Sequence, residues 1–388
     1  MSYPTVKMKD ITFIKTGKLD SNAAVDDGAY PFFTCDPNTL KINNWAYDTE
    51  AVLLAGNNAS GNYTAKYYKG KFNAYQRVYI IETSDPLVLN IRYLCYALNQ
   101  QLRLLKTMSS GSTTKFLTLG MLHGLDIPLP SIKVQEQIVS VLAAYDDLIE
   151  NNQKQIKLLE EAAQRLYKEW FVDLRFPGHE TTPITDGIPE GWQYSPLSEV
   201  FDFVRGKSYT SKELSDTVGV LMANLKNIRA FGGYKRNAEK RFTGQFKENQ
   251  TLAAGDVVMG VTDMTQERRL VGHVALVPDM GEAMTFSMDL IKIIPKLTDK
   301  LFVYSALYYG GLSKQISPLA NGVNVLHLKP EAMMGIEMLI PHDAIVRAYH
   351  ERISPIIVRI EALQKQCDIA AEARDRLIPK LMNGEIEV

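Results

Sequence analysis

The sequence has few cysteines and no long apolar run. Its three cysteines, Cys35, Cys95 and Cys367, are widely spaced among 388 residues, and no Cys-x-x-Cys pair occurs. This pattern excludes a disulfide framework and indicates no zinc site. No stretch approaches the ~20 consecutive apolar residues of a membrane-spanning helix, and no apolar run follows a basic start. We therefore expect a cytoplasmic protein.

Recognisable catalytic motifs are also missing. The six histidines form no His-Glu-x-x-His pattern, and neither a Gly-x-Ser-x-Gly elbow nor a Walker loop occurs. The Asn/Asp-Pro-Pro-aromatic segment with which amino-methylating enzymes hold a flipped base is absent too. Isolated carboxylates such as Asp126 and Asp256 are typical of turns. The sequence thus predicts a chain with no catalytic residues, no metal site and no cofactor of its own.

Charge of one sign is not in excess, because 43 Lys and Arg stand against 44 Asp and Glu. The distribution along the chain is uneven. Residues 1–135 carry 14 basic and 10 acidic residues, a net charge of +4, whereas residues 136–176 carry 5 and 8, a net charge of −3. Since a DNA-binding protein needs a basic face and not a basic total, this composition is compatible with a nucleic-acid partner.

The chain contains one long internal repeat. The segment from Gly111 to Pro130 aligns without a gap with the segment from Gly322 to Pro341, an offset of 211 positions. The starts of the two halves align at a different offset of 189, so the second half contains about 22 extra residues. A period near half the chain length excludes a solenoid, whose repeats have about 20–50 residues. The repeat predicts two copies of one domain-plus-helix unit with approximate twofold symmetry, and duplex DNA is a common twofold partner.

Each half begins with strand-like segments and ends in a helical one. Short apolar runs bounded by Gly, Asn and Pro predict mixed α/β domains over 1–130 and 196–341. A seam of apolar residues at alternating three- and four-residue steps then extends from Ile138 to Trp170, and a matching seam extends from Tyr349 to Leu381. We expect an α+β fold with two mixed α/β domains separated by two long antiparallel, coiled-coil helices. In the alternative interpretation, each seam packs on its own globular domain.

Three details refine this expectation. Asn152 is a polar residue in the first seam, and such a residue fixes helix register at some cost in stability. Pro355 and Pro379 are expected to bend the second helix and to end it or tilt its last turn. The Pro- and Gly-rich segment 176–195 predicts a linker that docks through Trp192.

Polar and basic residues gather in loops where they suit DNA recognition. Amides suit adenine edges, and Lys and Arg suit guanine edges or phosphates. A solvated polar surface is the alternative explanation for each of these clusters. The candidates in the first half are Asn57, Asn58, Asn62, Lys66, Lys69, Lys71 and the segment from Ser109 to Lys115. Those in the second half are Lys207, Lys226, Arg229, Lys235, Arg236, Lys240, Arg241, Arg268, Arg269 and Asn324, with Asn321 beside the last.

Three passages together resemble the specificity subunit of type I restriction–modification systems. They are the Pro-x-x-x-x-Gln-Glu-Gln-Ile pattern that begins at Pro130, the segment from Tyr167 to Gly178, and Ile188-Pro-Glu-Gly-Trp192. The resemblance covers the whole chain. It departs in the second copy, where the segment from Pro341 to Tyr349 lacks the Gln-Glu-Gln triplet.

The resemblance implies a non-catalytic DNA-reading subunit. Residues 1–130 and 196–341 would be target-recognition domains, 131–175 a central helix, 176–195 a linker and 342–388 a C-terminal helix. Each domain would read one half of a split, asymmetric site, with the helices setting the spacing. The partners implied are double-stranded DNA, two modification subunits and restriction subunits, and the latter two would carry S-adenosylmethionine, ATP and Mg²⁺. Candidate partner-binding residues are Gln135, Gln137, Trp170 and Phe171, of which the last two also suit a core.

Two other functions are compatible with the sequence. One is a DNA methyltransferase or nuclease with an unrecognised active site. The other is a coiled-coil scaffold with two ligand-binding domains and no role in nucleic-acid binding.

Overall fold

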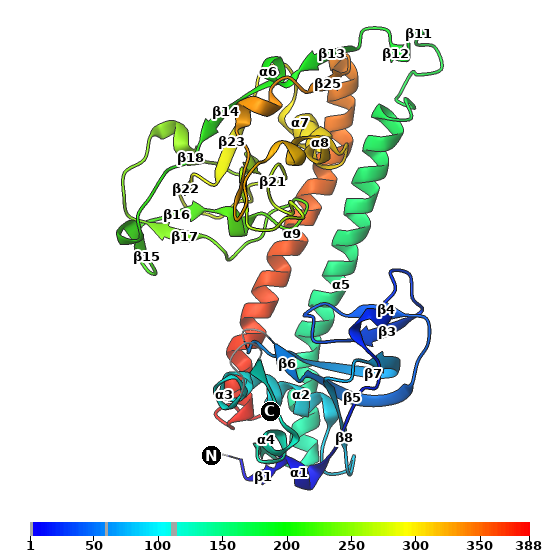
Figure 1. Cartoon of the computed structure of the whole chain (residues 1–388), viewed down its shortest axis with the longest axis vertical. Helices are drawn as coiled ribbons and strands as arrows, with labels where there is room; N and C mark the ends of the chain where they lie inside the picture. The colour runs from blue at the N-terminus through cyan, green and yellow to red at the C-terminus, as the bar shows by residue number, and fades with distance from the viewer. Residues whose placement is uncertain (1–2, 59–60, 110–114) are drawn as a thin grey trace. The chain divides into compact units, whose positions relative to one another are not determined.

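The computed structural model describes residues 3–58, 61–109 and 115–388. The chain forms two compact units, the first comprising residues 1–151 and 369–388 and the second residues 152–368. Each unit contains one strand-rich domain and one segment from each of two long helices (Figure 1). These helices are α5, Ile132–Phe171, and α9, Asp343–Met382, each of 40 residues.

Unit 1 is built on a six-stranded sheet with the order β2-β8-β5-β7-β3-β4. The smaller pairs β1–β10 and β6–β9 lie outside it. The strands are β1 Thr5–Lys7, β2 Thr12–Thr16, β3 Tyr30–Phe33, β4 Leu40–Ile42, β5 Tyr47–Ala55, β6 Asn57–Asn58, β7 Ala65–Ala74, β8 Val78–Thr83, β9 Lys115–Phe116 and β10 Asp126–Pro128. The short helices are α1 Met8–Ile11, α2 Ile91–Gln100, α3 Leu102–Met108 and α4 Leu119–His123.

Both faces of the unit 1 sheet are covered, as the continuous apolar run in β5 predicts. Val52 and Leu54 point into a core shared with α2 and with the α5 and α9 segments of this unit. Leu53 lies in a second cluster on the opposite face, with Phe33 and Phe72. This alternation is the period of two that a strand imposes on its side chains.

A polar contact fixes the helices of unit 1 to one another. Asp146 of α5 accepts a hydrogen bond from Tyr96 of α2 and one of 2.7 Å from Nη1 of Arg374 on α9. The two segments are antiparallel, because Ile138 near the start of α5 shares a core with Leu381 near the end of α9.

Unit 2 contains a four-stranded sheet, β14-β23-β19-β21, and a five-stranded sheet, β15-β17-β16-β22-β18. The strands are β11 Ile184–Thr185, β12 Ile188–Pro189, β13 Gln193–Pro196, β14 Phe201–Arg205, β15 Leu214–Ser215, β16 Val220–Ala223, β17 Lys240–Phe242, β18 Thr251–Leu252, β19 Val257–Gly260, β20 Thr262–Asp263, β21 Val274–Leu276, β22 Met284–Phe286, β23 Leu290–Pro295, β24 Leu326–His327 and β25 Glu337–Ile340. The helices are α6 Leu197–Val200, α7 Lys300–Tyr308 and α8 Leu312–Ile316.

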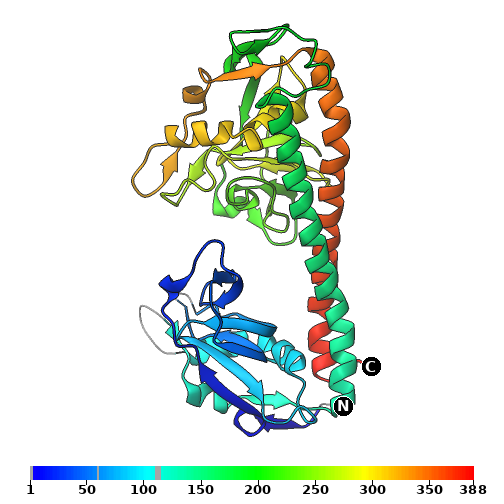
Figure 2. The same cartoon turned by 90° about the vertical axis from the view of Figure 1, so that its right-hand side faces the viewer.

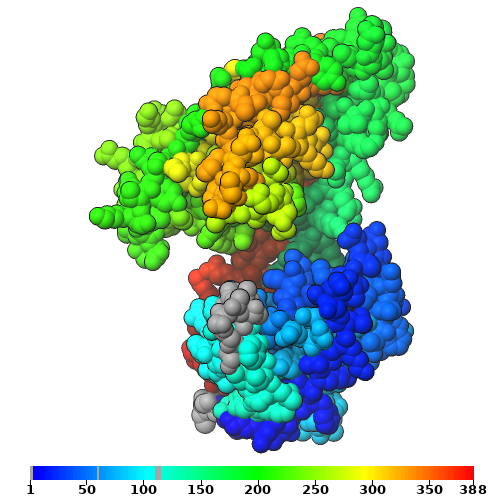
Figure 3. Space-filling model, in the orientation of Figure 1, coloured from blue at the N-terminus to red at the C-terminus, as the bar shows by residue number. Residues whose placement is uncertain are grey.

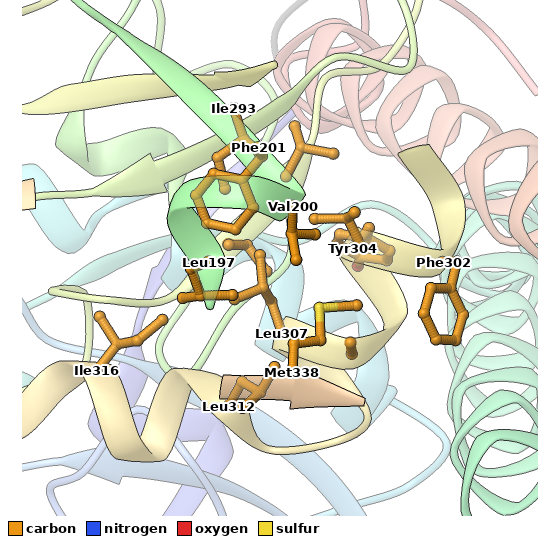
Figure 4. Close-up of a cluster of buried hydrophobic side chains, with 14 of the residues drawn as sticks. Leu197, Val200, Phe201, Ile293, Phe302, Tyr304, Leu307, Leu312, Ile316 and Met338 are labelled. Carbon is orange, nitrogen blue, oxygen red and sulfur yellow. The ribbon is translucent and has the colours of Figure 1, made fainter. Parts of the chain in front are cut away.

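The main core of unit 2 joins its domain to the long helices. Figure 4 shows side chains from α6, β14, β23, α7, α8 and β25 meeting in this cluster. Aromatic residues extend the cluster to the helices, with Phe171 packed on Phe302 at a centroid distance of 4.9 Å and on Tyr349 at 4.9 Å. Trp192 is buried beside Phe176 and Phe171, so the linker docks as predicted.

The two halves repeat the same order of elements. α1 begins at Met8 and α6 at Leu197, 189 positions later, while α5 and α9 begin 211 positions apart. β6–β9 corresponds to β20–β24, because Phe116 pairs with Asn57 and His327 pairs with Thr262. The internal repeat predicted from the sequence is therefore confirmed in the elements themselves.

The predicted seams are buried, and they serve two purposes. In unit 2, α5 and α9 run antiparallel side by side (Figure 2), with Ile156 packed against Ile360 and Leu363. Towards the helix ends, the same seams enter the domain cores, as Trp170 and Tyr349 do in unit 2. Some turns of each seam therefore pair the two helices, and other turns pack on a globular domain. Each of the two interpretations is right for part of the seam. α9 is continuous through Pro355 and Pro379, ending three residues after the latter.

Candidate nucleic-acid interface

Several of the loop candidates come together in two equivalent places. In unit 1, β6 with Asn57 and Asn58 pairs antiparallel with β9, which begins at Lys115. In unit 2, β20 and β24 form the corresponding pair, and the loops 264–270 and 321–325 leave its end. We give the name first loop pair to the described residues at and beside β6–β9, which are Asn57, Asn58, Asn62, Lys106 and Lys115. The second loop pair is the loops 264–270 and 321–325.

The first loop pair is rich in amides and lysines. Asn58 Oδ1 accepts a hydrogen bond of 3.1 Å from the backbone N–H of Asn62. Lys106, at the end of α3, donates to Asn62 Oδ1 at 2.8 Å. Sequence reasoning missed Lys106, because it lies on a helix outside the polar runs. Of the predicted segment Ser109 to Lys115, residues 110–114 lie outside the described range, as does Gly111 of the repeat.

Asn57 carries an unusual feature of this loop pair. Its Oδ1 atom is buried and has no hydrogen-bond partner among the described residues. Buried amide oxygens are normally paired, and the nearby residues 59–60 and 110–114 lie outside the described range.

The β7 lysines are engaged within their own domain. Lys66 Nζ lies 3.2 Å from Thr39 Oγ1 and 3.4 Å from the carbonyl oxygen of Asp36, and burial lowers its pKa. Lys69 forms a 3.0 Å ion pair with Glu50. Lys71 Nζ lies 4.7 Å from the ring centroid of Trp45. Exposed Lys69 and Lys71 remain accessible at the surface, whereas Lys66 supports the loop 36–39.

The second loop pair presents Arg269 and Asn324 to solvent. Arg268 is half-buried, with a left-handed backbone (φ of 52°) and a buried Nε that has no partner among the described residues. The segment from α8 to β25 (yellow-orange), which includes the loop 321–325, lies at the surface that faces the viewer in Figure 3. Lys207 lies beyond the end of β14, at a bridge to Ser287.

The basic run 226–241 divides into exposed and engaged cations. Lys226, Arg229 and Lys235 are exposed and line an open groove of about 680 Å³ together with Asn237 and Glu239. None of these three cations forms a salt bridge with another described residue. Lys226 and Lys235 are therefore accessible to an anionic partner such as a phosphate backbone, whereas Arg229 also interacts with the carboxylates of Glu160 on α5 and Asp368 on α9.

The other three cations of this run contact residues of the same chain. The side chain of Arg236 is only 11% exposed and lies 3.3 Å from Glu361 of α9. Lys240 donates to the Tyr209 hydroxyl at 2.7 Å, above the same ring. Arg241 contacts both carboxylate oxygens of Glu282. All three side chains thus have partners within the chain. Arg236 is withdrawn from the DNA-binding candidates because it is buried, and Lys240 and Arg241 stay predictions.

The Arg241 ion pair is bidentate. Nη1 and Nη2 lie 2.8 and 3.0 Å from the two carboxylate oxygens of Glu282. The hydrogen bond from Arg241 lowers the pKa of Glu282, and the bond to Glu282 raises the pKa of Arg241. Because both groups are solvent-exposed in part, this pair orients the side chains more than it stabilises the fold.

The candidate partner-binding residues are mostly interior. Gln135 is fully buried, accepting from the N–H of Asn90 and donating to the carbonyl oxygens of Val88 and Pro130. Trp170 and Phe171 lie in the unit 2 core. The structure thus corrects these three assignments to structural roles, since their side chains fill space or satisfy backbone groups. Gln137 is exposed on the first turns of α5 and stays a prediction.

The described residues show neither a metal-binding cluster nor a membrane-spanning helix. Among them, no group of three or more His, Cys, Asp or Glu side chains is placed to hold a metal ion. None of the helices in the described part of the chain is long and apolar enough to cross a membrane.

Comparison with known proteins adds a consistent set of relatives. Residues 2–161 match the family model of the type I restriction modification DNA specificity domain. The chain is 36% identical over 225 residues to the type I restriction enzyme EcoDI specificity subunit of Escherichia coli, covering 52% of this chain and 49% of that protein. It is 28% identical over 326 residues to the MjaIX specificity subunit of Methanocaldococcus jannaschii, covering 78% of this chain and 70% of the relative.

The chain thus spans about half the length of the Escherichia coli relative in that alignment. A solved structure with the same fold is the S subunit of a type I restriction-modification system from M. genitalium, with a TM-score of 0.64 and 14% identity, covering 98% of this chain and 96% of that one. The resemblance stated from the sequence is confirmed. These similar proteins are themselves named specificity subunits.

Proposed function

We propose that the chain is a specificity subunit of a type I restriction–modification system, as its similar proteins are, and that its two domains each read one half of a bipartite, asymmetric DNA site. The observation that carries this proposal is the chemical difference between two structurally equivalent loop pairs. The first has Asn57, Asn58, Lys106 and Lys115, and the second has Arg269 beside the loop 321–325. Equivalent positions with different hydrogen-bond donors and acceptors suit the recognition of two different short base sequences, here called DNA words.

The exposed cations of unit 2 would hold the DNA backbone. Lys226, Arg229 and Lys235 line one groove without an acidic salt-bridge partner among the described residues. Phosphate contacts of this kind position a protein on the duplex without reading sequence. Base-edge contacts would then come from the two loop pairs.

The two long helices would set the distance between the half-sites and bind the partner subunits. Each has 40 residues, a length of about 60 Å at ~1.5 Å per residue, against ~34 Å for one DNA turn. We propose that two modification subunits bind the helices, with exposed Gln137 as one contact, and that restriction subunits join them. S-adenosylmethionine, ATP and Mg²⁺ would reside on these partners.

Selection from random duplex tests the central proposal. The full chain, alone and co-expressed with the modification subunits of its host, is equilibrated with a random duplex pool, and bound DNA is sequenced. We expect enrichment of two short words at a fixed spacing. Mapping methylated adenines across the host genome should return the same two words. Affinity for the selected site no better than for bulk DNA would contradict the proposal.

Two alternatives are a scaffold without a nucleic-acid role and a methyltransferase or nuclease with an unrecognised active site. Charge reversal at Lys226, Arg229 and Lys235 distinguishes a scaffold from a DNA-binding subunit. A scaffold would assemble and function unchanged. A DNA reader should lose affinity and show a shallower dependence of binding on salt. Calorimetric titration of the isolated chain with S-adenosylmethionine should show no binding.

A further inference from the structure

The second loop pair is held in one conformation by a buried carboxylate. Asp263 at the end of β20 is 0% exposed. Its Oδ1 accepts from the N–H and the hydroxyl of Thr265, both at 2.8 Å. Its Oδ2 accepts from the N–H groups of Leu270 at 2.5 Å and Val271 at 3.2 Å. Both ends of the loop 264–270 are therefore fixed to a single side chain.

The opposite loop is closed by its own backbone. Asn321 and His327 exchange two backbone hydrogen bonds of 3.0 and 2.8 Å. Gly322 between them has a φ of 150°, and a Cβ there would lie 1.9 Å from the carbonyl oxygen of Val325. Only glycine fits this turn. The segment from 322 to 326 is thus a tight, closed loop with Val323 and Asn324 at its tip.

A side-chain bond joins the two loops. Gln266 Nε2 donates to the backbone carbonyl oxygen of Val323 at 2.9 Å. Met264 follows directly after Asp263, whose strand partner Leu326 ends the opposite loop. Met264 and Val323 consequently leave the same end of the β20–β24 pair, from loops that are bonded to each other.

The side chains at this end are apolar and exposed. Val323 is 87% exposed and Met264 is 77% exposed. Single exposed apolar residues are common and carry no meaning alone. Here the chain holds two of them on a preorganised surface beside Arg269 and Asn324, the groups that suit a polyanion and a base edge.

A neighbouring residue, Phe231, is also apolar and exposed and is bonded to the loop 264–270. Phe231 is exposed, although its backbone is left-handed with a φ of 66°, which is an outlier for a bulky residue. Its N–H donates to the carbonyl oxygen of Arg269 at 2.7 Å, which fixes it against the loop 264–270. Strain of this kind is retained where the surrounding structure specifies a surface.

We infer that Val323 and Met264 are specificity-determining residues that contact thymine methyl groups in the half-site read by unit 2. The inference rests on the proposed function. The 5-methyl group of thymine is the one apolar feature of a base edge in the major groove, and it is read by apolar side chains. The flanking Arg269 and Asn324 would supply the polar contacts beside it. The second half-site therefore contains at least one A·T pair whose thymine methyl is in contact with the protein.

Replacement of thymine by uracil tests the inference, because it removes only the methyl group. The probe is the duplex selected by the full chain with its modification subunits, with each thymine of the second half-site replaced in turn by deoxyuridine. Wild-type affinity should fall about fourfold at one position, the value of one buried methyl group, ~0.8 kcal/mol. Val323→Ala or Met264→Ala should weaken binding to the thymine duplex to a similar extent, and then be insensitive to deoxyuridine at that position.

Val218→Ala is the matched control, since Val218 is 60% exposed in the turn before β16 and carries the same side chain. It should retain wild-type affinity and the full deoxyuridine effect. Circular dichroism melting confirms that each variant folds. Wild-type binding that is insensitive to deoxyuridine throughout the second half-site overturns the inference and leaves the proposed function intact. The same holds for a deoxyuridine effect that persists in both variants. Absence of any preferred duplex contradicts the proposed function itself.

Discussion

Cationic side chains in unit 2 perform two different tasks. Lys226, Arg229 and Lys235 extend into solvent from a groove, whereas Arg236 lies against Glu361 with 11% of its side chain exposed. The charges are the same, but desolvation decides their use. An exposed cation keeps its hydration and can exchange it for a phosphate, while a buried cation is already matched by a carboxylate.

Single substitutions at adjacent positions should separate these tasks. Lys235→Ala is expected to reduce the slope of log K against log salt by about 1 and to leave the unfolding free energy unchanged. Arg236→Ala should instead lower the unfolding free energy by about 1–2 kcal/mol, because Glu361 loses its cationic partner and, among the described residues, keeps only the N–H of Asp279. Fluorescence anisotropy at several salt concentrations and urea unfolding measure the two effects. The opposite pattern would show that the groove is structural and that Arg236 is the DNA contact.

Asp263 should make the stability of unit 2 depend on pH. Burial alone would raise the pKa of this carboxyl, but the N–H groups of Leu270, Thr265 and Val271 lower it below its ordinary value. A depressed folded-state pKa contributes stability above the unfolded value, about 3.9, and loses that contribution as the pH falls through the folded pKa.

We predict that Asp263→Asn lowers the unfolding free energy by about 2 kcal/mol at pH 7, since an amide cannot accept with both of its terminal groups. Below about pH 4 the difference between wild type and variant should shrink, because the wild-type carboxylate becomes protonated. Urea unfolding at pH 7, 5 and 3.5 measures this. A difference that stays constant down to pH 3 would show that Asp263 contributes through shape and not through charge.

The long helices are elements whose apolar seam is divided between two kinds of packing. Ile156, Ile360 and Leu363 pack helix against helix in unit 2. Trp170 and Tyr349 belong to the same seams but lie in the domain core. The period of apolar residues specifies which face of a helix is buried. It cannot specify whether that face packs on the other helix or on a domain, because either apolar surface can cover it.

Asn152 is the polar interruption of this seam. It is 2% exposed and donates from Nδ2 to Gln366 Oε1 at 3.2 Å. We predict that Asn152→Leu raises the unfolding free energy by about 1 kcal/mol, because an amide is replaced by an apolar side chain at a buried position while the exposed Gln366 can bond water.

Asn151→Leu, at the exposed neighbouring position, is the matched control and should change stability by less than about 0.5 kcal/mol. Chemical denaturation followed by circular dichroism measures both variants. Destabilisation by Asn152→Leu would mean that the amide bond is worth more than the apolar contact that replaces it.

The molecule as a whole is a duplication whose two copies have diverged in defined segments. The offset between equivalent residues is 189 at α1 and α6, and 205 at β5 and β19, where Val52 and Val257 pair with Ile81 and Ile293. Sixteen of the extra residues therefore lie between β14 and β19. That segment also carries the basic run 226–241. By contrast, α5 and α9 have the same length, as do β2 and β14 near the start of each domain.

Exchange of one whole domain tests this division. Replacing residues 196–341 by the equivalent domain of a relative should change the second word of the methylated site and leave the first word unchanged, because the buried cores of the two domains are separate clusters. Mapping of methylated adenines in cells that express the hybrid with its modification subunits measures both words. A change in both words would mean that the domains do not read independently.

The sequence by itself determined the duplication, the two helices and their seam, the docking of Trp192 and the resemblance to a known family. These features are periodic or local, so a pattern of residue types is enough to specify them. The tertiary structure decided which polar residues are accessible. Lys106 joined the first loop pair from a helix, Arg236 turned inward to Glu361, and Gln135, Trp170 and Phe171 became interior. Accessibility depends on what packs against each side chain, and most of those neighbours are distant in sequence.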